Sequence, residues 1–260
     1  MDECNNRKSD IRNRNFIRKS KIVNRKLLTR LLLRTGIFAA AMAFLESAVV
    51  VYLRALYYPE GFVFPLRMMD QQVLVTEIIR EAATMVMLFT ISMIAARSRI
   101  SRFAFFIYVF AVWDIFYYIY LFLLLGWPPS FLTWDLLFLI PVTWAGPVVA
   151  PMINSLTMIL LAVIILYYRS KDESFRLTFY EWILLIVGSL IVIFSYTRPY
   201  MEYMLKQYSF SEMLHFRENT KLIEYAAVFV PANFSWLTYS LGQLLFFWSI
   251  FHVIMRMKRE

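Results

Sequence analysis

Six long stretches of predominantly apolar residues run through this chain, and their length constrains the fold more than any other feature. A helix of about 20 apolar residues crosses the hydrocarbon core of a bilayer, whereas the apolar positions of a water-soluble fold recur periodically in shorter segments. The sequence therefore predicts an all-α fold, a polytopic transmembrane helical bundle. The six predicted spans are 36–57, 72–96, 103–126, 137–168, 178–197 and 232–255.

The lysine and arginine residues between these stretches predict the orientation. Twenty of them lie in the N-terminal segment, in the joints 97–102 and 169–177, and in the C-terminal tail, which share one side of the membrane if the chain crosses six times. The opposite side holds five, which are Arg67, Arg198, Lys206, Arg217 and Lys221. Because short cytoplasmic loops are enriched in Lys and Arg, both termini are predicted to be cytoplasmic.

The chain divides into a basic arm, residues 1–35, and a six-span domain, residues 36–260. Apolar residues alternate with the basic ones in the arm, which predicts a basic amphipathic helix that lies on anionic lipids and leads into the first span. The net charge of +9 does not indicate nucleic acid as a partner, because the basic residues sit in this arm and in the joints. The lipid bilayer and its anionic lipids are thus the predicted partners, and the sequence gives no oligomeric state.

The fourth apolar segment is irregular. Residues 135–168 would extend about 50 Å as one helix, which exceeds a hydrocarbon core of about 30 Å. Pro141, Gly146, Pro147 and Pro151 interrupt it. We expect a short outer helix or a re-entrant piece, followed by a span from about Pro147; a proline kink in one tilted helix is the alternative.

Two further patterns concern the ends of helices. Thr178–Glu181 and Ser209–Glu212 have the spacing of capping boxes and predict the start of the fifth span and of a short interfacial helix. Tryptophan and tyrosine residues at the span ends, Tyr58 and Trp127 among them, are typical of interfacial aromatic belts. His215 and His252 fall on opposite sides of the membrane, which argues against a site built on both histidines.

Ionisable residues inside the spans are costly and therefore mark a candidate site. Glu46 lies about 15 Å along the first span, and Glu77 and Glu81 are one turn apart on the second. Asp114 lies near the middle of the third span. The candidate site residues are Glu46, Glu77, Arg80, Glu81, Asp114 and Tyr118, with Arg54 and Asp135 as supporting residues.

These depths allow Glu46, Glu81 and Asp114 to lie in one layer, with Glu77 a turn above. Four carboxylates against two arginines leave an excess of about two negative charges, so some carboxylates must be protonated, hydrated or bound to a cation. This favours a polar site that opens outward between the first three spans. In the alternative, Arg54 and Arg80 clamp the carboxylates in a purely structural network. No organic cofactor is predicted, and a divalent cation such as Mg²⁺ or Ca²⁺ is the metal that an all-oxygen site would take.

Three segments, Phe44–Arg54, Val112–Tyr118 and Trp134–Pro141 leading to Gly146-Pro147, carry a resemblance to a family. Over roughly residues 40–155 the chain resembles a group of uncharacterised bacterial polytopic membrane proteins. The resemblance implies a multi-pass protein of the bacterial inner membrane and implies no activity, substrate or active-site residue.

The favoured function is proton- or cation-linked handling or transport of a small solute, because transporters place such sites near the midplane at broken helices. Glu46, Glu81 and Asp114 would carry the proton or cation, Glu77 would assist, and Arg80 would hold the carboxylates or an anionic group of the substrate. Two alternatives stay open. One is an intramembrane enzyme that acts on a lipid or quinone, with a carboxylate as general base or metal ligand. The other is a non-catalytic membrane assembly subunit.

Overall fold

The structure is a computed structural model that describes residues 2–65, 67–139, 142–214 and 220–259, with side chains described from Lys26 onward except those of Leu214 and Thr220. Pro141, His215 and Arg217 lie outside the described residues. The long helices are α1 (Asp2–Tyr57), α2 (Gln71–Ala95), α3 (Arg99–Leu125), α4 (Val149–Lys171), α5 (Phe179–Met204) and α8 (Trp236–Arg259). Each contains a stretch long and apolar enough to cross a membrane. The chain is thus an all-α, multi-pass integral membrane protein, as predicted.

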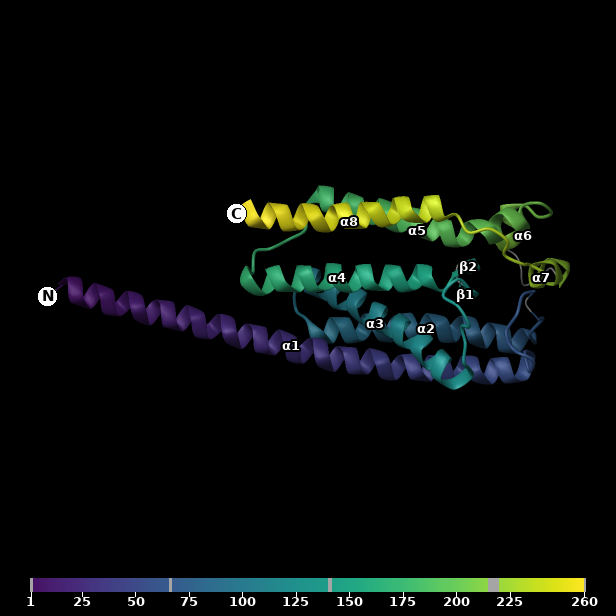
Figure 1. The fold of residues 1–260 in the computed structure, drawn as a ribbon, viewed down its shortest axis with the longest axis horizontal. Helices are drawn as coiled ribbons and strands as arrows, with labels where there is room; N and C mark the ends of the chain where they lie inside the picture. The colour runs from purple at the N-terminus through teal and green to yellow at the C-terminus, as the bar shows by residue number, and fades with distance from the viewer. Residues whose placement is uncertain (1, 66, 140–141, 215–219, 260) are drawn as a thin grey trace.

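Helix α3 lies at the centre of the bundle, in contact with α1, α2 and α4, and α4 also contacts α8, which packs along α5. Figure 1 shows both termini at one end of the bundle, as six crossings require. The short helices α6 (Phe210–Leu214) and α7 (Thr220–Ala227) lie at the opposite end, near the loop that follows α1. We call the end of the bundle that carries both termini the terminal end, and the opposite end the loop end.

The basic arm is not a separate helix. Helix α1 runs from Asp2 to Tyr57 without interruption, and Figure 1 shows its N-terminal part continuing in the direction of the span, beyond the ends of the other helices. The arm therefore projects from the terminal end instead of folding back over it. Its binding to anionic lipids stays a prediction.

Local sequence explains several helix ends. The Thr178 side chain caps the Glu181 N–H, and the Glu181 carboxylate accepts a hydrogen bond from the Thr178 N–H, so the predicted capping box is confirmed. The Ser209–Glu212 capping box is also present at the start of α6, and its hydrogen bonds from Ser209 hold the pKa of Glu212 below its usual value. Helix α3 ends because Gly126 adopts a left-handed conformation, φ 63°, and its N–H bonds to the carbonyl of Phe122 at 2.9 Å.

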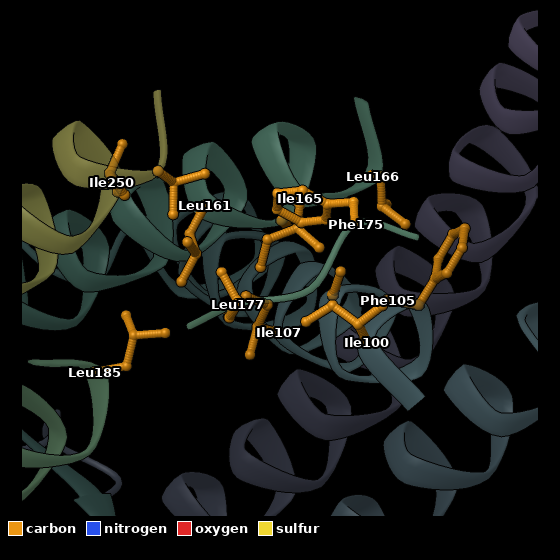
Figure 2. Close-up of a cluster of buried hydrophobic side chains, with 13 residues drawn as sticks. Ile100, Phe105, Ile107, Leu161, Ile165, Leu166, Phe175, Leu177, Leu185 and Ile250 are labelled. Atoms are coloured by element: carbon orange, nitrogen blue, oxygen red, sulfur yellow. The ribbon is translucent and has the colours of Figure 1, made fainter. Parts of the chain in front are cut away.

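Small and polar residues set the distances between helices. A Cβ atom at Gly242 of α8 would lie 2.9 Å from the carbonyl oxygen of Gly188 in α5, so these two glycines allow the helix backbones to touch. Gln243 accepts a hydrogen bond from Thr157 and donates one to Asn154, both at 3.1 Å, which joins α8 to α4. Toward the terminal end, apolar side chains of α3, α4, α5, α8 and the α4–α5 connection form a continuous buried cluster (Figure 2).

The fourth predicted span begins too early. Residues 137–139 and 142–147 are not part of a helix, because Trp134–Phe138 (β1) and Trp144–Pro147 (β2) pair as a two-stranded antiparallel sheet, and α4 starts only at Val149. The described residues of this segment form neither the short outer helix nor the kinked continuous helix, whereas the start of α4 at Val149 agrees with the span expected from about Pro147. Pro147 supplies no N–H and ends the sheet, whereas Pro151 falls in the first turn of α4, where its missing N–H would have no intrahelical partner. Gly146 allows a close approach of this segment to α5, since a Cβ atom at this position would lie 3.0 Å from the ring of Tyr196.

Candidate functional site

All eight candidate residues line one cavity of about 160 Å³ between α1, α2, α3 and the β1–β2 hairpin. Helix α1 contributes Glu46 and Arg54, α2 contributes residues from its first three turns, and α3 contributes residues from its second half. Both strands of the hairpin line the cavity, and Ser155 of α4 and Tyr196 of α5 complete the wall. The long helices therefore bring together residues that are far apart in the sequence, from position 46 to position 135.

Arg80 is shared by two of the carboxylates. Its Nε and Nη2 atoms bond to the two carboxylate oxygens of Glu77 at 2.8 and 2.5 Å, a bidentate arrangement that the spacing of three residues on one helix allows. The same guanidinium contacts the carboxylate of Glu46 on α1. Glu46 also accepts a hydrogen bond from the Thr84 hydroxyl at 3.2 Å. This group links α1 to α2 and includes part of the predicted structural network.

Arg54 of α1 contacts Asp135 of the hairpin. Its ion pair is not with Glu46, the acid that lies two turns earlier on the same helix. Its Nη2 atom lies 3.7 Å from a carboxylate oxygen of Asp135, and the Tyr118 hydroxyl donates to the second carboxylate oxygen at 3.1 Å. The guanidinium also lies over the rings of Trp127 and Phe62, 3.9 and 4.6 Å from their centroids. Asp135 is only 2% exposed, so it lies inside the protein and joins the hairpin to α1 and α3.

Trp127 and Tyr58 surround this second group, contrary to the prediction that they belong to interfacial belts. Both are buried, with 8% of their surface exposed. Trp127 stacks against Tyr118, and Tyr58 packs edge-on against Phe62. A position at a span end does not separate the two roles, because an aromatic ring near the bilayer surface can face either lipid or a buried cation.

Glu81 and Asp114 differ from the other acids of the cavity, because neither forms an ion pair with a described residue. Both oxygens of Glu81 face the backbone N–H of Leu139, at 3.1 and 3.3 Å. Asp114 accepts one hydrogen bond, from the Ser155 hydroxyl at 2.7 Å. A single neutral donor compensates only a small part of the cost of removing a carboxylate from water. These two acids are therefore the uncompensated charges of the cavity.

Aromatic rings form most of the remaining wall, including Phe110, Trp113, Tyr117, Phe138, Trp144 and Tyr196. Trp113 is 5% exposed and stacks near Tyr117, and Phe138 of β1 packs on Trp144 of β2. The indole N–H groups of Trp113 and Trp144 are buried without a hydrogen-bond partner in the described part of the chain. A buried indole N–H usually has a partner, so the cavity combines acids, rings and two unused indole donors.

Sequence reasoning does not single out Trp113, Phe138, Trp144 or Ser155 as part of the site. Their apolar or weakly polar side chains look the same in a lipid-facing position, and only the pairing of the hairpin brings Phe138 and Trp144 to the cavity.

Glu181 has a second role besides its capping box. Its buried carboxylate also contacts Arg256 at 3.1 Å and His252 at 3.0 Å. This contact joins α5 to α8 at the terminal end, away from the cavity. Among the described residues, no three or more His, Cys, Asp or Glu side chains are grouped so as to hold a metal ion.

The chain matches none of the protein-family models, curated proteins or solved structures with which it was compared. What the cavity can do chemically follows from its own geometry.

Proposed function

We propose that this membrane protein binds a small solute in the cavity and couples its binding or transport to the neutralisation of Glu81 and Asp114. The observation that carries the proposal is that two carboxylates outside any described ion pair face a cavity beside two arginines already held by other acids. The proposal adds that the two acids exchange a proton or a cation when the solute enters or leaves.

The physical reason is electrostatic. The cavity is lined by five acids, Glu46, Glu77, Glu81, Asp114 and Asp135, and by two arginines, so three negative charges exceed the positive ones. In surroundings less polar than water, uncompensated charge of this size must be relieved by protons, by water or by a bound cation. A solute that changes this balance therefore changes the number of protons or cations bound.

The position of the cavity supports handling of a solute. It lies toward the loop end, beside a segment in which the β1–β2 hairpin replaces helix, and transporters build their sites where helices are broken near the membrane interior. With cytoplasmic termini, as the distribution of Lys and Arg indicates, the cavity belongs to the outer half of the protein. We place the protein in a bacterial inner membrane with the site accessible from the outside.

The protonation of the two acids can be tested without knowing the solute. Infrared difference spectra of the protein in lipid, recorded while the pH is changed, report the carbonyl stretch of protonated carboxyl groups. We expect such bands to titrate in the wild type and to be reduced in Glu81→Gln and Asp114→Asn. Glu60→Gln, which changes an exposed acid in the α1–α2 loop, serves as the matched control. Spectra of the two cavity variants that are identical to the wild type would contradict proton linkage.

A second experiment addresses transport. The protein is reconstituted into liposomes that contain a pH-sensitive dye, and gradients of small amines, carboxylic acids and sugars are applied one at a time. We expect one class to change the internal pH in the wild type and in Glu60→Gln, and to have no effect in Asp114→Asn. Solute uptake that leaves the internal pH unchanged, at equal rates in all three proteins, would refute the coupling.

A further inference from the structure

We infer that the solute is a small organic ammonium compound that also carries a hydrogen-bond acceptor oxygen, held by Glu81 and Asp114 with its alkyl groups against the aromatic wall. This inference rests on the proposed function, because it names the class of solute that the cavity binds. The observations that support it are the charge, the wall and the unused donors of the cavity.

The excess negative charge of the cavity favours a cationic solute. Arg80 is held by Glu77 and Glu46, and Arg54 by Asp135 and two aromatic rings. Among the described residues, neither arginine forms an ion pair with Glu81 or Asp114, whose hydrogen bonds come from one backbone N–H and one hydroxyl. An anionic ligand would add repulsion to this arrangement, and a neutral one would leave the excess charge in place.

The wall selects an organic cation over an inorganic one. A small divalent ion needs several oxygen ligands that converge on one point, and the described acids form no such group. Aromatic faces attract alkylated ammonium groups, which shed water more readily than metal ions do and match apolar surroundings. The rings of Phe110, Trp113, Tyr117 and Trp144 line the same cavity as the two acids.

The size of the cavity agrees with this class. An engineered protein cavity of about 150 Å³ holds a molecule as large as benzene, and the cavity here is about 160 Å³. A tetraalkylated nitrogen with a short substituent is of comparable volume. A larger solute, such as a whole phospholipid, could place only its headgroup there.

The two indole N–H groups without partners indicate that the solute carries an acceptor oxygen. Trp113 and Trp144 both line the cavity, and their N–H groups lack partners in the region that the structure describes. Leaving a buried donor unpaired is costly, and an ammonium group cannot relieve that cost because it accepts no hydrogen bond. A hydroxyl, ether or ester oxygen on the same molecule supplies the missing acceptor.

The test measures binding of choline by isothermal titration calorimetry to the full chain in phosphatidylglycerol nanodiscs, whose lipid carries no ammonium group. The comparison compound is 3,3-dimethyl-1-butanol, which has the same shape without the charge. We expect choline to bind at least about tenfold more tightly than this neutral compound, a difference that a cation–π and carboxylate site readily provides. Equal binding of the two compounds, or no binding of either, would overturn the inference.

Variants locate the site. We expect Glu81→Gln and Asp114→Asn to weaken choline binding about tenfold or more, and Glu60→Gln to leave it unchanged. Trp113→Phe keeps an aromatic face, although a smaller one, and removes the donor, so it should weaken binding of choline more than binding of tetramethylammonium, which has no oxygen. Because the comparison of choline with its neutral analogue uses only the wild type, a variant that fails to fold does not remove the test. Binding of Ca²⁺ or Mg²⁺ in place of choline would overturn the organic class.

Two further measurements distinguish a lipid headgroup from a free solute, and the ammonium class from the proton linkage. If choline binds in phosphatidylglycerol nanodiscs but not in phosphatidylcholine nanodiscs, the natural ligand is a lipid headgroup. Equal binding in both kinds of nanodisc identifies a free solute. Both outcomes support the ammonium chemistry. Titration in two buffers of different ionisation enthalpy counts the protons released. Choline binding without proton release refutes the proton linkage alone, and titrating infrared bands without choline binding refute the ammonium class alone.

Discussion

Replacing Arg80 by methionine should destabilise the protein by about 3 kcal/mol. The substitution leaves Glu46 and Glu77, whose side chains are 10 and 11% exposed, without their shared cation. Removing one partner of a buried ion pair typically costs about 3–5 kcal/mol, because the remaining charge is left uncompensated. Since the Arg80 side chain is 20% exposed, the lower part of that range applies.

The assay is reversible unfolding in mixed micelles, titrated with a denaturing detergent and followed by tryptophan fluorescence. If the loss arises from stranded carboxylates, the triple variant with Arg80→Met, Glu46→Gln and Glu77→Gln should recover to within about 1 kcal/mol of the wild type. Arg198→Met is the control, because the Arg198–Glu202 pair is exposed and contributes less than about 1 kcal/mol. A single variant as stable as the wild type, or a triple variant no better than the single one, would refute the reasoning.

Three other predictions use the same unfolding assay. Glu81→Gln and Asp114→Asn keep an oxygen that accepts the hydrogen bonds from Leu139 and Ser155. The free energy of unfolding of each variant should therefore stay within about 1 kcal/mol of the wild type, while the titrating infrared bands are lost. Unfolding of both variants would indicate a structural role instead. Gly242→Val places a Cβ atom 2.6 Å from Val192 and 2.9 Å from the Gly188 carbonyl oxygen, which should cost about 1–3 kcal/mol, whereas Ser240→Val on the exposed face of the same helix should change little. Glu181→Ala removes a fully buried carboxylate that binds Arg256 and His252, which should lower the free energy of unfolding by about 3 kcal/mol. A loss below about 1 kcal/mol would show that only the helix cap contributes to stability.

The parts of the fold that follow from the bilayer were predictable. The thickness of the hydrocarbon core requires long apolar helices, and the Lys and Arg residues between them indicate the side of each joint. The fourth segment was not predictable in the same way, because hydropathy does not distinguish an apolar helix from an apolar strand of similar composition. Leu136, Leu137 and Phe138 would suit either structure. Only the pairing with residues 144–147 decides between them.

The candidate site was predictable in membership and less so in pairing. Depth along a helix follows from a fixed rise per residue, so the sequence alone assigns Glu46, Glu81 and Asp114 to similar depths. Which charge meets which depends on the rotation of each helix and on the path of the hairpin. Arg54 contacts Asp135, 81 positions later, although Glu46 lies closer in sequence on the same helix. Residue spacing carries no information about such contacts.

The pattern of pairing argues that the cavity does more than fix helix packing. A network with a structural role alone is most stable when each buried charge is compensated, since every uncompensated charge adds to the cost of folding. Arg80 and Arg54 provide such compensation, and they join α1 to α2 and to the hairpin. Glu81 and Asp114 add no comparable link, because a neutral amide could accept the same hydrogen bonds from Leu139 and Ser155. An amide cannot exchange a proton near neutral pH and carries no negative charge. Those two properties distinguish the carboxylates of Glu81 and Asp114 at the wall of a cavity large enough for a small organic molecule.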